Sequence, residues 1–167
     1  MRLFAAIRLS PAAEDALAGA QETLRRAGRG SFPQREMLHL TLAFLGEVED
    51  AAPAEAAVEA LRGTGAFSLT LEGTGRFGDT WWAGVRENPA LETLALGLQG
   101  DLRRRGFSLE ERPWRPHITL VRHYRPKGEP PVLTLPPVTM EVGSVVLLES
   151  LRRAGRAVYE TRYETKL

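Results

Sequence analysis

The sequence predicts an α+β fold made of two related halves, with antiparallel or mixed sheets around a central cleft and helices on the outer faces. One observation is the loose alternation of strand and helix patterns, in which several strands follow one another directly. The other is an internal repeat. The segment 4–42 returns 78 positions later without a gap, and about 14 of its 39 residues are identical. Two copies are too few for a solenoid, so a duplicated domain with a pseudo-two-fold axis is favoured.

The chain is predicted to form one bilobal domain over residues 1–167, with an internal repeat of about 2–46 and 80–124, because no linker is long or polar enough to separate independent domains. Hydrophobic residues make up 43% of the chain and charged residues 26%, which is typical of a globular protein in water. No run approaches the roughly 20 apolar residues that a membrane span needs. The absence of cysteine excludes disulfides and thiolate chemistry. We therefore expect a cytoplasmic, monomeric protein.

Capping residues and short apolar runs predict the individual elements. Ser10 followed by Pro11 typically opens a helix and Gly28 ends it, and Asn88 with Pro89 repeats this pattern in the second half. The first half is predicted to contain a strand over 2–9, a helix over 11–27, a loop over 29–36, a strand over 38–45 and a helix over 51–61. The second half is predicted to contain a strand over 67–71, a turn region over 73–79, a strand over 81–86, a helix over 89–105, a strand over 117–123, a loop over 125–131 and strands over 138–148 and 157–165.

A His-x-Thr-Leu motif occurs at equivalent positions of the two copies, 39–42 and 117–120. Successive side chains of a strand point to opposite faces, so each histidine shares a face with the threonine two residues on. A repeat that only built a core would retain apolar positions more readily than a polar pair, because burying polar groups is costly. The pattern predicts a pocket that holds His39, Thr41, His117 and Thr119.

Two imidazoles that titrate near neutral pH suit paired general acid–base catalysis. In phosphodiester cleavage a neutral histidine takes a proton from the attacking group, a protonated one gives a proton to the leaving oxygen, and hydroxyls hold the phosphate oxygens. A zinc site would need a third ligand. His123 has the strand parity of His117, but it lies six residues on, roughly 20 Å along an extended strand. We therefore expect no metal and no cofactor, and interpret His123 as a strand-end residue.

The motifs and their flanking sequences, HLTLAFLG and PHITLVR, together with RLFAAI and FGDTWWAGV, resemble the two-histidine (2H) phosphoesterases. Within that superfamily the chain is similar to the bacterial and archaeal RNA 2′,3′-cyclic phosphodiesterases, once called 2′-5′ RNA ligases. The resemblance covers nearly the whole chain. It implies a bilobal fold with both motifs in a central cleft. It also implies metal-independent hydrolysis of a 2′,3′-cyclic phosphate, at an RNA end or in a small cyclic nucleotide, to a 2′-phosphate.

The resemblance also implies roles for individual residues. His39 would be the proton donor to the leaving 3′ oxygen, and His117 the proton acceptor that activates water. Thr41 and Thr119 would bind the phosphate, assisted by Arg122. The strand parity of Arg122 is opposite to that of His117, so its side chain reaches the site only if the strand twists or bulges.

The two copies differ just after the motifs, where Phe44 corresponds to Arg122. The parity of Phe44 predicts a core position. Trp82 is likewise predicted to be a strand core residue, although an exposed tryptophan could stack on a base. Arg112 and Arg115 precede the second motif and are well placed to guide RNA.

Two other functions stay open on the sequence alone. Ligation of RNA ends through a 2′-5′ bond would use the same site in the reverse direction. A nucleotide- or RNA-binding module would keep the fold without turnover, although intact histidines in both copies argue against it.

Overall fold

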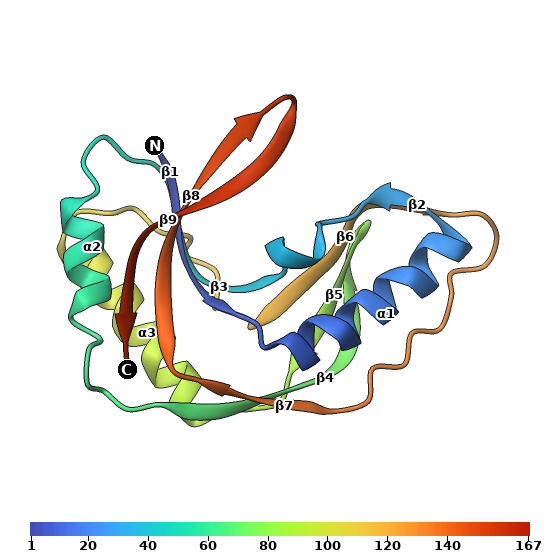
Figure 1. Ribbon diagram of the computed structural model, residues 1–167, viewed down its shortest axis with the longest axis horizontal. Coiled ribbons are helices and arrows are strands. Elements are labelled where there is room, and N and C mark those ends of the chain that lie inside the picture. Colours follow the sequence, from blue (N-terminus) through green and yellow to red (C-terminus); the bar gives the residue numbers. More distant parts are fainter.

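A computed structural model describes residues 1–167 as two sheets and three α-helices, which confirms the predicted α+β class (Figure 1). One sheet has the strand order β3-β1-β8-β9 and the other β2-β6-β5-β4-β7. All the strand pairs are antiparallel. The elements are β1 (Arg2–Arg8), α1 (Pro11–Ala27), β2 (Gly28–Ser31), a 3-10 turn (Arg35–Met37), β3 (His39–Glu47), α2 (Ala52–Glu59), β4 (Phe67–Phe77), β5 (Thr80–Val85), α3 (Pro89–Arg104), β6 (His117–Pro126), β7 (Val138–Val142), β8 (Ser144–Arg153) and β9 (Arg156–Lys166).

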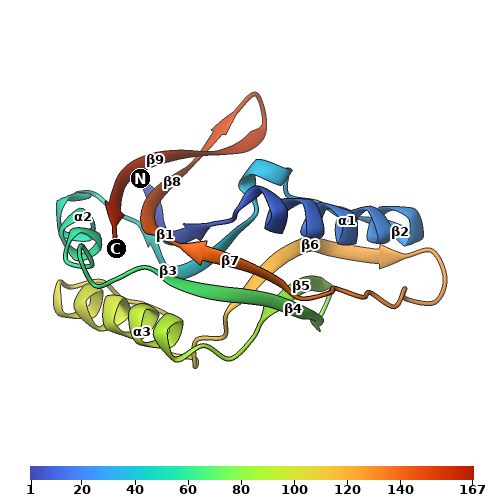
Figure 2. The ribbon, with the colours of Figure 1, turned by 60° about the horizontal axis from the view of Figure 1, so that its bottom comes forward.

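The helices of the two copies are exchanged between the sheets. Helix α1 follows β1 of the first copy, yet it packs against β6 and β7 of the second sheet, and α3 of the second copy packs against β3 of the first (Figure 2). Both helices begin as predicted: the Ser10 hydroxyl accepts from the Ala13 amide at 3.2 Å, and the Asn88 side chain accepts from the Leu91 amide at 3.0 Å. As a result, each motif strand packs against the helix of the other copy: β6 against α1 and β3 against α3. None of the helices combines the length and apolar character that crossing a membrane requires.

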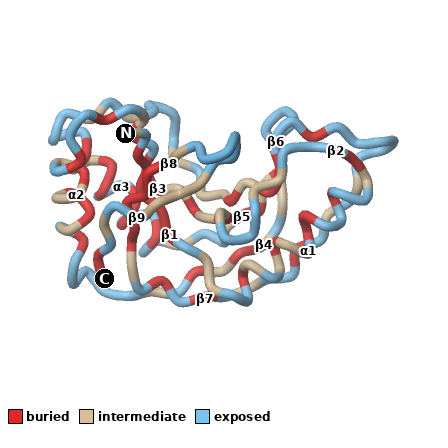
Figure 3. The backbone as a smooth tube through the Cα atoms, turned by 45° about the horizontal axis from the view of Figure 1, so that its top comes forward, coloured by how far each residue is buried: buried red, intermediate tan, exposed pale blue.

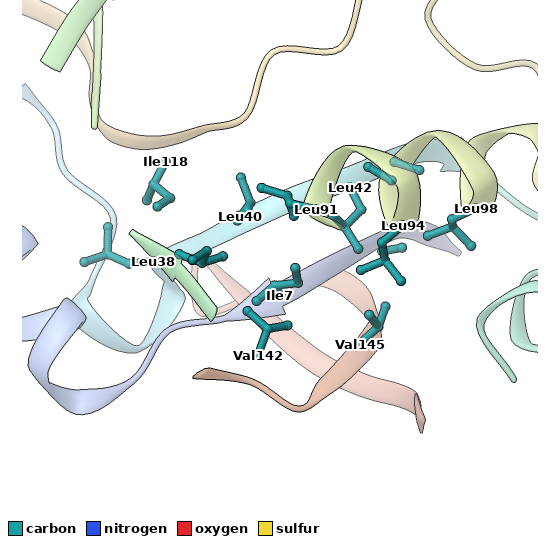
Figure 4. Packing of buried hydrophobic residues seen from close by; sticks show 14 of the residues in the cluster. Ile7, Leu38, Leu40, Leu42, Leu91, Leu94, Leu98, Ile118, Val142 and Val145 are labelled. Atoms are coloured by element: carbon teal, nitrogen blue, oxygen red, sulfur yellow. The ribbon is translucent and has the colours of Figure 1, made fainter. Parts of the chain in front are cut away.

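The main core lies between the sheets and the helices. Strand β1 is buried over five consecutive residues because it is an inner strand covered on both faces, which explains its continuous apolar run. The labelled core residues meet from several elements in Figure 4; they are Ile7, Leu38, Leu40, Leu42, Leu91, Leu94, Leu98, Ile118, Val142 and Val145. Figure 3 shows buried segments in β1, in β3 and in the first half of β8. The tip of the β8–β9 hairpin is exposed.

The prediction of a loop over 29–36 is wrong for its first residues, which form strand β2. The chain passes directly from α1 into β2, which pairs with β6. Gly28 is in an extended conformation, and a Cβ there would lie 2.5 Å from the Arg125 carbonyl oxygen. The glycine therefore permits a close approach of two backbones, a role that its position at a helix end had concealed.

Two further strand boundaries differ from prediction. The turn region predicted over 73–79 belongs mostly to β4, which continues to Phe77. At Gly75 a Cβ would lie 2.2 Å from the Trp82 ring, so the glycine leaves room for the indole across the strand pair. The single strand predicted over 138–148 is broken at Gly143 into β7 and β8, which join different sheets. The apolar character of 138–148 gives no sign of such a break, although β7 alternates between buried and exposed residues and β8 is continuously buried over 145–149.

Both motif strands contain a β-bulge at the same position of the repeat. In β3 the extra residue is Leu42, and in β6 it is Leu120, each directly after the His-x-Thr triplet. The ladder pairs on either side are Ala6–Thr41 and Ala5–Ala43 in the first sheet, and Trp82–Thr119 and Trp81–Val121 in the second. A bulge shifts all following side chains to the other face of the strand. The residues two positions beyond each bulge, Phe44 and Arg122, therefore share a face with the histidines.

Candidate active site

His39 begins β3 and lies over a small apolar cluster on one face of the first sheet. Its ring centroid is 5.0 Å from that of Phe4 and 5.5 Å from that of Tyr159. Nδ1 is 2.8 Å from the Met37 carbonyl oxygen, and Nε2 is 2.9 Å from the Thr41 hydroxyl. A carbonyl oxygen only accepts, so Nδ1 carries a proton. In the neutral ring Nε2 then accepts from Thr41, which is the predicted partner on the same strand face.

Burial lowers the pKa of His39 below its ordinary value of 6.5. The positive charges of Arg122 and His117 lower the pKa further, while the hydrogen bond to the Met37 carbonyl opposes the shift. Arg122 and His117 both come from β6 of the other sheet, and β6 contacts β3, the strand that carries His39.

This shift predicts a pH dependence of stability. Since the folded-state pKa of His39 lies below 6.5, the unfolded chain takes up a proton at this ring before the folded chain does. The associated stability is fully present above about pH 6.5 and is lost as the pH falls toward the folded-state pKa. Thermal unfolding should therefore give a smaller drop in Tm between about pH 7.5 and pH 5 for His39→Gln than for the parent protein. The exposed His123 provides the matched His→Gln control, and an equal drop in all three proteins would contradict this account.

His117 opens β6 and repeats the arrangement of His39. Its Nδ1 is 2.7 Å from the carbonyl oxygen of Arg115, again two residues earlier, so the proton again lies on Nδ1. Its ring is 5.4 Å from Phe77 and 6.1 Å from Trp82, measured between centroids. Both motifs thus fix the same tautomer and leave Nε2 as the atom for chemistry.

A groove of about 650 Å³ runs beside these residues. It is lined by Thr41 and His117, by Phe44 and Phe77, by the segment 112–115 and by several neighbours. The Trp114 indole donates to the Thr41 carbonyl at 3.2 Å and so ties this segment to β3. Arg112 and Arg115, the two arginines predicted to guide RNA, both line the groove.

The remaining predicted residues take the following places. Thr119 is partly buried on the His117 face of β6, where it pairs with Trp82 in the ladder. The bulge at Leu120 turns Arg122 to that face. Such a bulge is the condition on which the predicted access of Arg122 to the site depends. The core position predicted for Phe44 is wrong: its side chain is 48% exposed, since the first bulge also turns it out of the core. Trp82 is partly buried rather than a true core residue.

His123 does not join the other histidines. It adopts φ 55° beyond the bulge and lies 3.8 Å from Asp79, with three-quarters of its side chain exposed. The structure contains no group of three or more His, Cys, Asp or Glu side chains that could hold a metal ion. A three-histidine ligand set is therefore not formed by these residues.

Tyr159 lies next to His39 and was not among the residues predicted from the sequence. It comes from β9, outside the repeat, and its ring lies edge-on to Phe4 at 4.9 Å and to His39 at 5.5 Å. Burial raises the pKa of its hydroxyl, which therefore stays protonated at neutral pH. No pattern in the sequence links this residue to the motifs, because the β8–β9 hairpin is present in one copy only.

Comparison with known proteins gives a consistent picture. A family model described as the 2′-5′ RNA ligase superfamily matches residues 13–154. A protein of Thermotoga maritima named RNA 2′,3′-cyclic phosphodiesterase is 32% identical over 177 residues, covering 98% of this chain and 94% of that protein. The protein of the same name from Escherichia coli is 36% identical over 132 residues, covering 75% and 71%. The crystal structure of E. coli LigT complexed with 3′-AMP matches with a TM-score of 0.81 at 31% identity, covering 99% of this chain and 97% of that one.

Proposed function

The chain belongs to the 2′-5′ RNA ligase superfamily, and from that membership we propose that it hydrolyses 2′,3′-cyclic phosphates at RNA ends to 2′-phosphates without a metal ion. One observation of the structure carries the proposal. Each copy supplies an imidazole whose Nδ1 is held by a carbonyl two residues earlier, at 2.8 Å for His39 and 2.7 Å for His117. This leaves two Nε2 atoms, one from each sheet, for an acid and a base. Its relatives named RNA 2′,3′-cyclic phosphodiesterase support the substrate class.

The reaction needs two proton transfers on opposite sides of phosphorus, because the attacking and leaving oxygens lie roughly in line. His117 takes a proton from water at Nε2 as the hydroxide adds to phosphorus. The bond from phosphorus to the 3′ oxygen breaks, and protonated His39 gives its Nε2 proton to that oxygen. One water is consumed, and the products are a 3′ hydroxyl and a 2′-phosphate. Two histidines on strands of different sheets meet this geometric demand better than two on one strand would.

Three side chains bind the phosphate in this mechanism. The hydroxyls of Thr41 and Thr119 donate to non-bridging oxygens, and the guanidinium of Arg122 adds a charge-assisted contact. Thr41 is already 2.9 Å from Nε2 of His39, so one hydroxyl can serve both the acid and the phosphate oxygen beside it. The bound anion also favours the protonated form of His39, which burial and Arg122 disfavour in the free protein.

Ligation through a 2′-5′ bond is the same chemistry in reverse, with a ribose hydroxyl in place of water. Hydrolysis is favoured because the curated relatives carry the name of the phosphodiesterase. A binding module without turnover would not require both rings to be held in one tautomer. Since both histidines come from one chain, we propose that the bilobal domain acts as a monomer. We also propose that its partner is RNA and that it acts in the cytoplasm.

Product analysis tests the proposal directly. Oligonucleotides of several lengths that end in a 2′,3′-cyclic phosphate should be converted to 2′-phosphate ends at the same rate with and without a chelator. Enzymes specific for 2′- or 3′-phosphates can identify the product. A 3′-phosphate product would exclude the step written here, and strong inhibition by the chelator would favour a metal-dependent reaction. Binding without conversion would favour the module.

A further inference from the structure

Two glutamines are buried in the core at equivalent positions of the repeat. Gln21 of α1 is 2% exposed and Gln99 of α3 is 8% exposed. A buried amide is costly unless its polar atoms are hydrogen-bonded, so an apolar residue would be the simpler choice inside a helix–sheet interface. The two side chains therefore call for an explanation other than packing.

Each glutamine donates to the bulge in the motif strand of the other copy. The Gln21 side-chain amide donates to the Leu120 carbonyl at 3.0 Å and to the Pro33 carbonyl at 3.0 Å. The Gln99 amide donates to the Leu42 carbonyl at 2.7 Å. These two leucines are the bulged residues, which have no partner on the neighbouring strand of the ladder. The glutamines thus supply donors at the positions where the bulges interrupt the sheets.

The bulges decide which residue faces the site. Without the extra Leu120, the side chain of Arg122 would point to the face opposite His117, as strict alternation requires. Without the extra Leu42, Phe44 would point into the core rather than line the groove. A hydrogen bond that stabilises a bulge therefore also fixes the third side chain on the active face.

We propose that Gln21 and Gln99 are positioning residues, each of which holds the bulge of the opposite copy and so keeps Arg122 or Phe44 on the active face. The proposal rests on the proposed function only in so far as Arg122 binds the phosphate. The exchange of helices between the sheets is what allows this crossed arrangement. It lets each copy fix the orientation of the residue two positions after the bulge in the other copy's motif strand.

A crossed set of double variants tests the proposal, with binding of 3′-AMP as the readout. Gln21→Met keeps the volume but removes the donor, and should raise the Kd for 3′-AMP about tenfold. Arg122→Ala should also raise the Kd, and the double variant should bind no more weakly than Arg122→Ala alone. Gln99→Met is the matched control: its effect should add to that of Arg122→Ala but not to that of Phe44→Ala.

Crystal structures of Gln21→Met and of the shorter Gln21→Asn provide a readout that needs no ligand. The expected result is loss of the bulge at Leu120 and movement of Arg122 away from the His117 face. Retention of the bulge with Arg122 in place would overturn the proposal, as would equal coupling of both glutamines to Arg122. Because neither readout involves turnover, a protein that binds but does not hydrolyse would count against the proposed function and not against this inference. If Gln21→Met does not fold, the Asn variant decides the question.

Discussion

Replacing His39 or His117 with alanine is expected to reduce hydrolysis of a 2′,3′-cyclic phosphate by about a hundredfold to ten-thousandfold in each case. Each imidazole supplies one of two proton transfers, so the loss of either removes an acid or a base that water replaces poorly. The effect should appear mainly in kcat, because neither ring is needed to hold the phosphate charge. Single-turnover rates with a cyclic-phosphate-ended oligonucleotide measure it, and the variant of both histidines should lose little more than the worse single variant.

The matched control is His123→Ala, which removes the same side chain from the same strand as His117 but outside the site, and should keep the parent activity. The two roles can be separated with a cyclic substrate that has sulfur in place of the 3′ oxygen. A thiolate leaves without protonation because thiols are far more acidic than alcohols. This substrate should restore the rate of His39→Ala and not that of His117→Ala. If this substrate restored the rate of His117→Ala instead, His117 would be the acid and His39 the base.

The repeat is what made so much of this molecule predictable. Two copies of one pattern support the same strands, the same capped helices and the same His-x-Thr pair. The prediction failed where it assumed strict alternation. Strict alternation would bury Phe44 and turn Arg122 away from the histidines, whereas the bulges place both residues on the histidine face.

Tertiary features outside the repeat had no local signal. The break at Gly143 sends one apolar stretch into two sheets, and only the sheet topology reveals it. Tyr159 lies beside His39 although it comes from β9, a strand of the first sheet that is outside the repeat. Gln21 and Gln99 did align in the sequence, but their role as donors to the opposite strands depends on the exchange of helices, which a repeat with two equivalent packings does not specify.

Arg122→Ala is expected to raise KM for the cyclic phosphate about tenfold to a hundredfold, the effect of losing a charge-assisted hydrogen bond worth roughly 1.5–3 kcal/mol. Arg122→Lys should recover part of the loss, since lysine keeps the charge but not the planar fork of donors. Steady-state kinetics on the parent and both variants measure this. Arg125→Ala removes the same charge three residues further along β6, and is the control that should leave KM unchanged.

The same substitution should move one limb of the pH profile of kcat/KM. The positive charge of Arg122 disfavours the imidazolium of His39, so its removal lets the pKa of His39 rise toward 6.5. If His39 is the acid, it stays protonated to higher pH in Arg122→Ala, and the alkaline limb moves to higher pH. If His39 were the base, the acidic limb would move up instead, because more of the ring would be blocked by a proton. A profile that keeps both limbs in place would mean that Arg122 does not act on His39 during the reaction, whatever it contributes to binding.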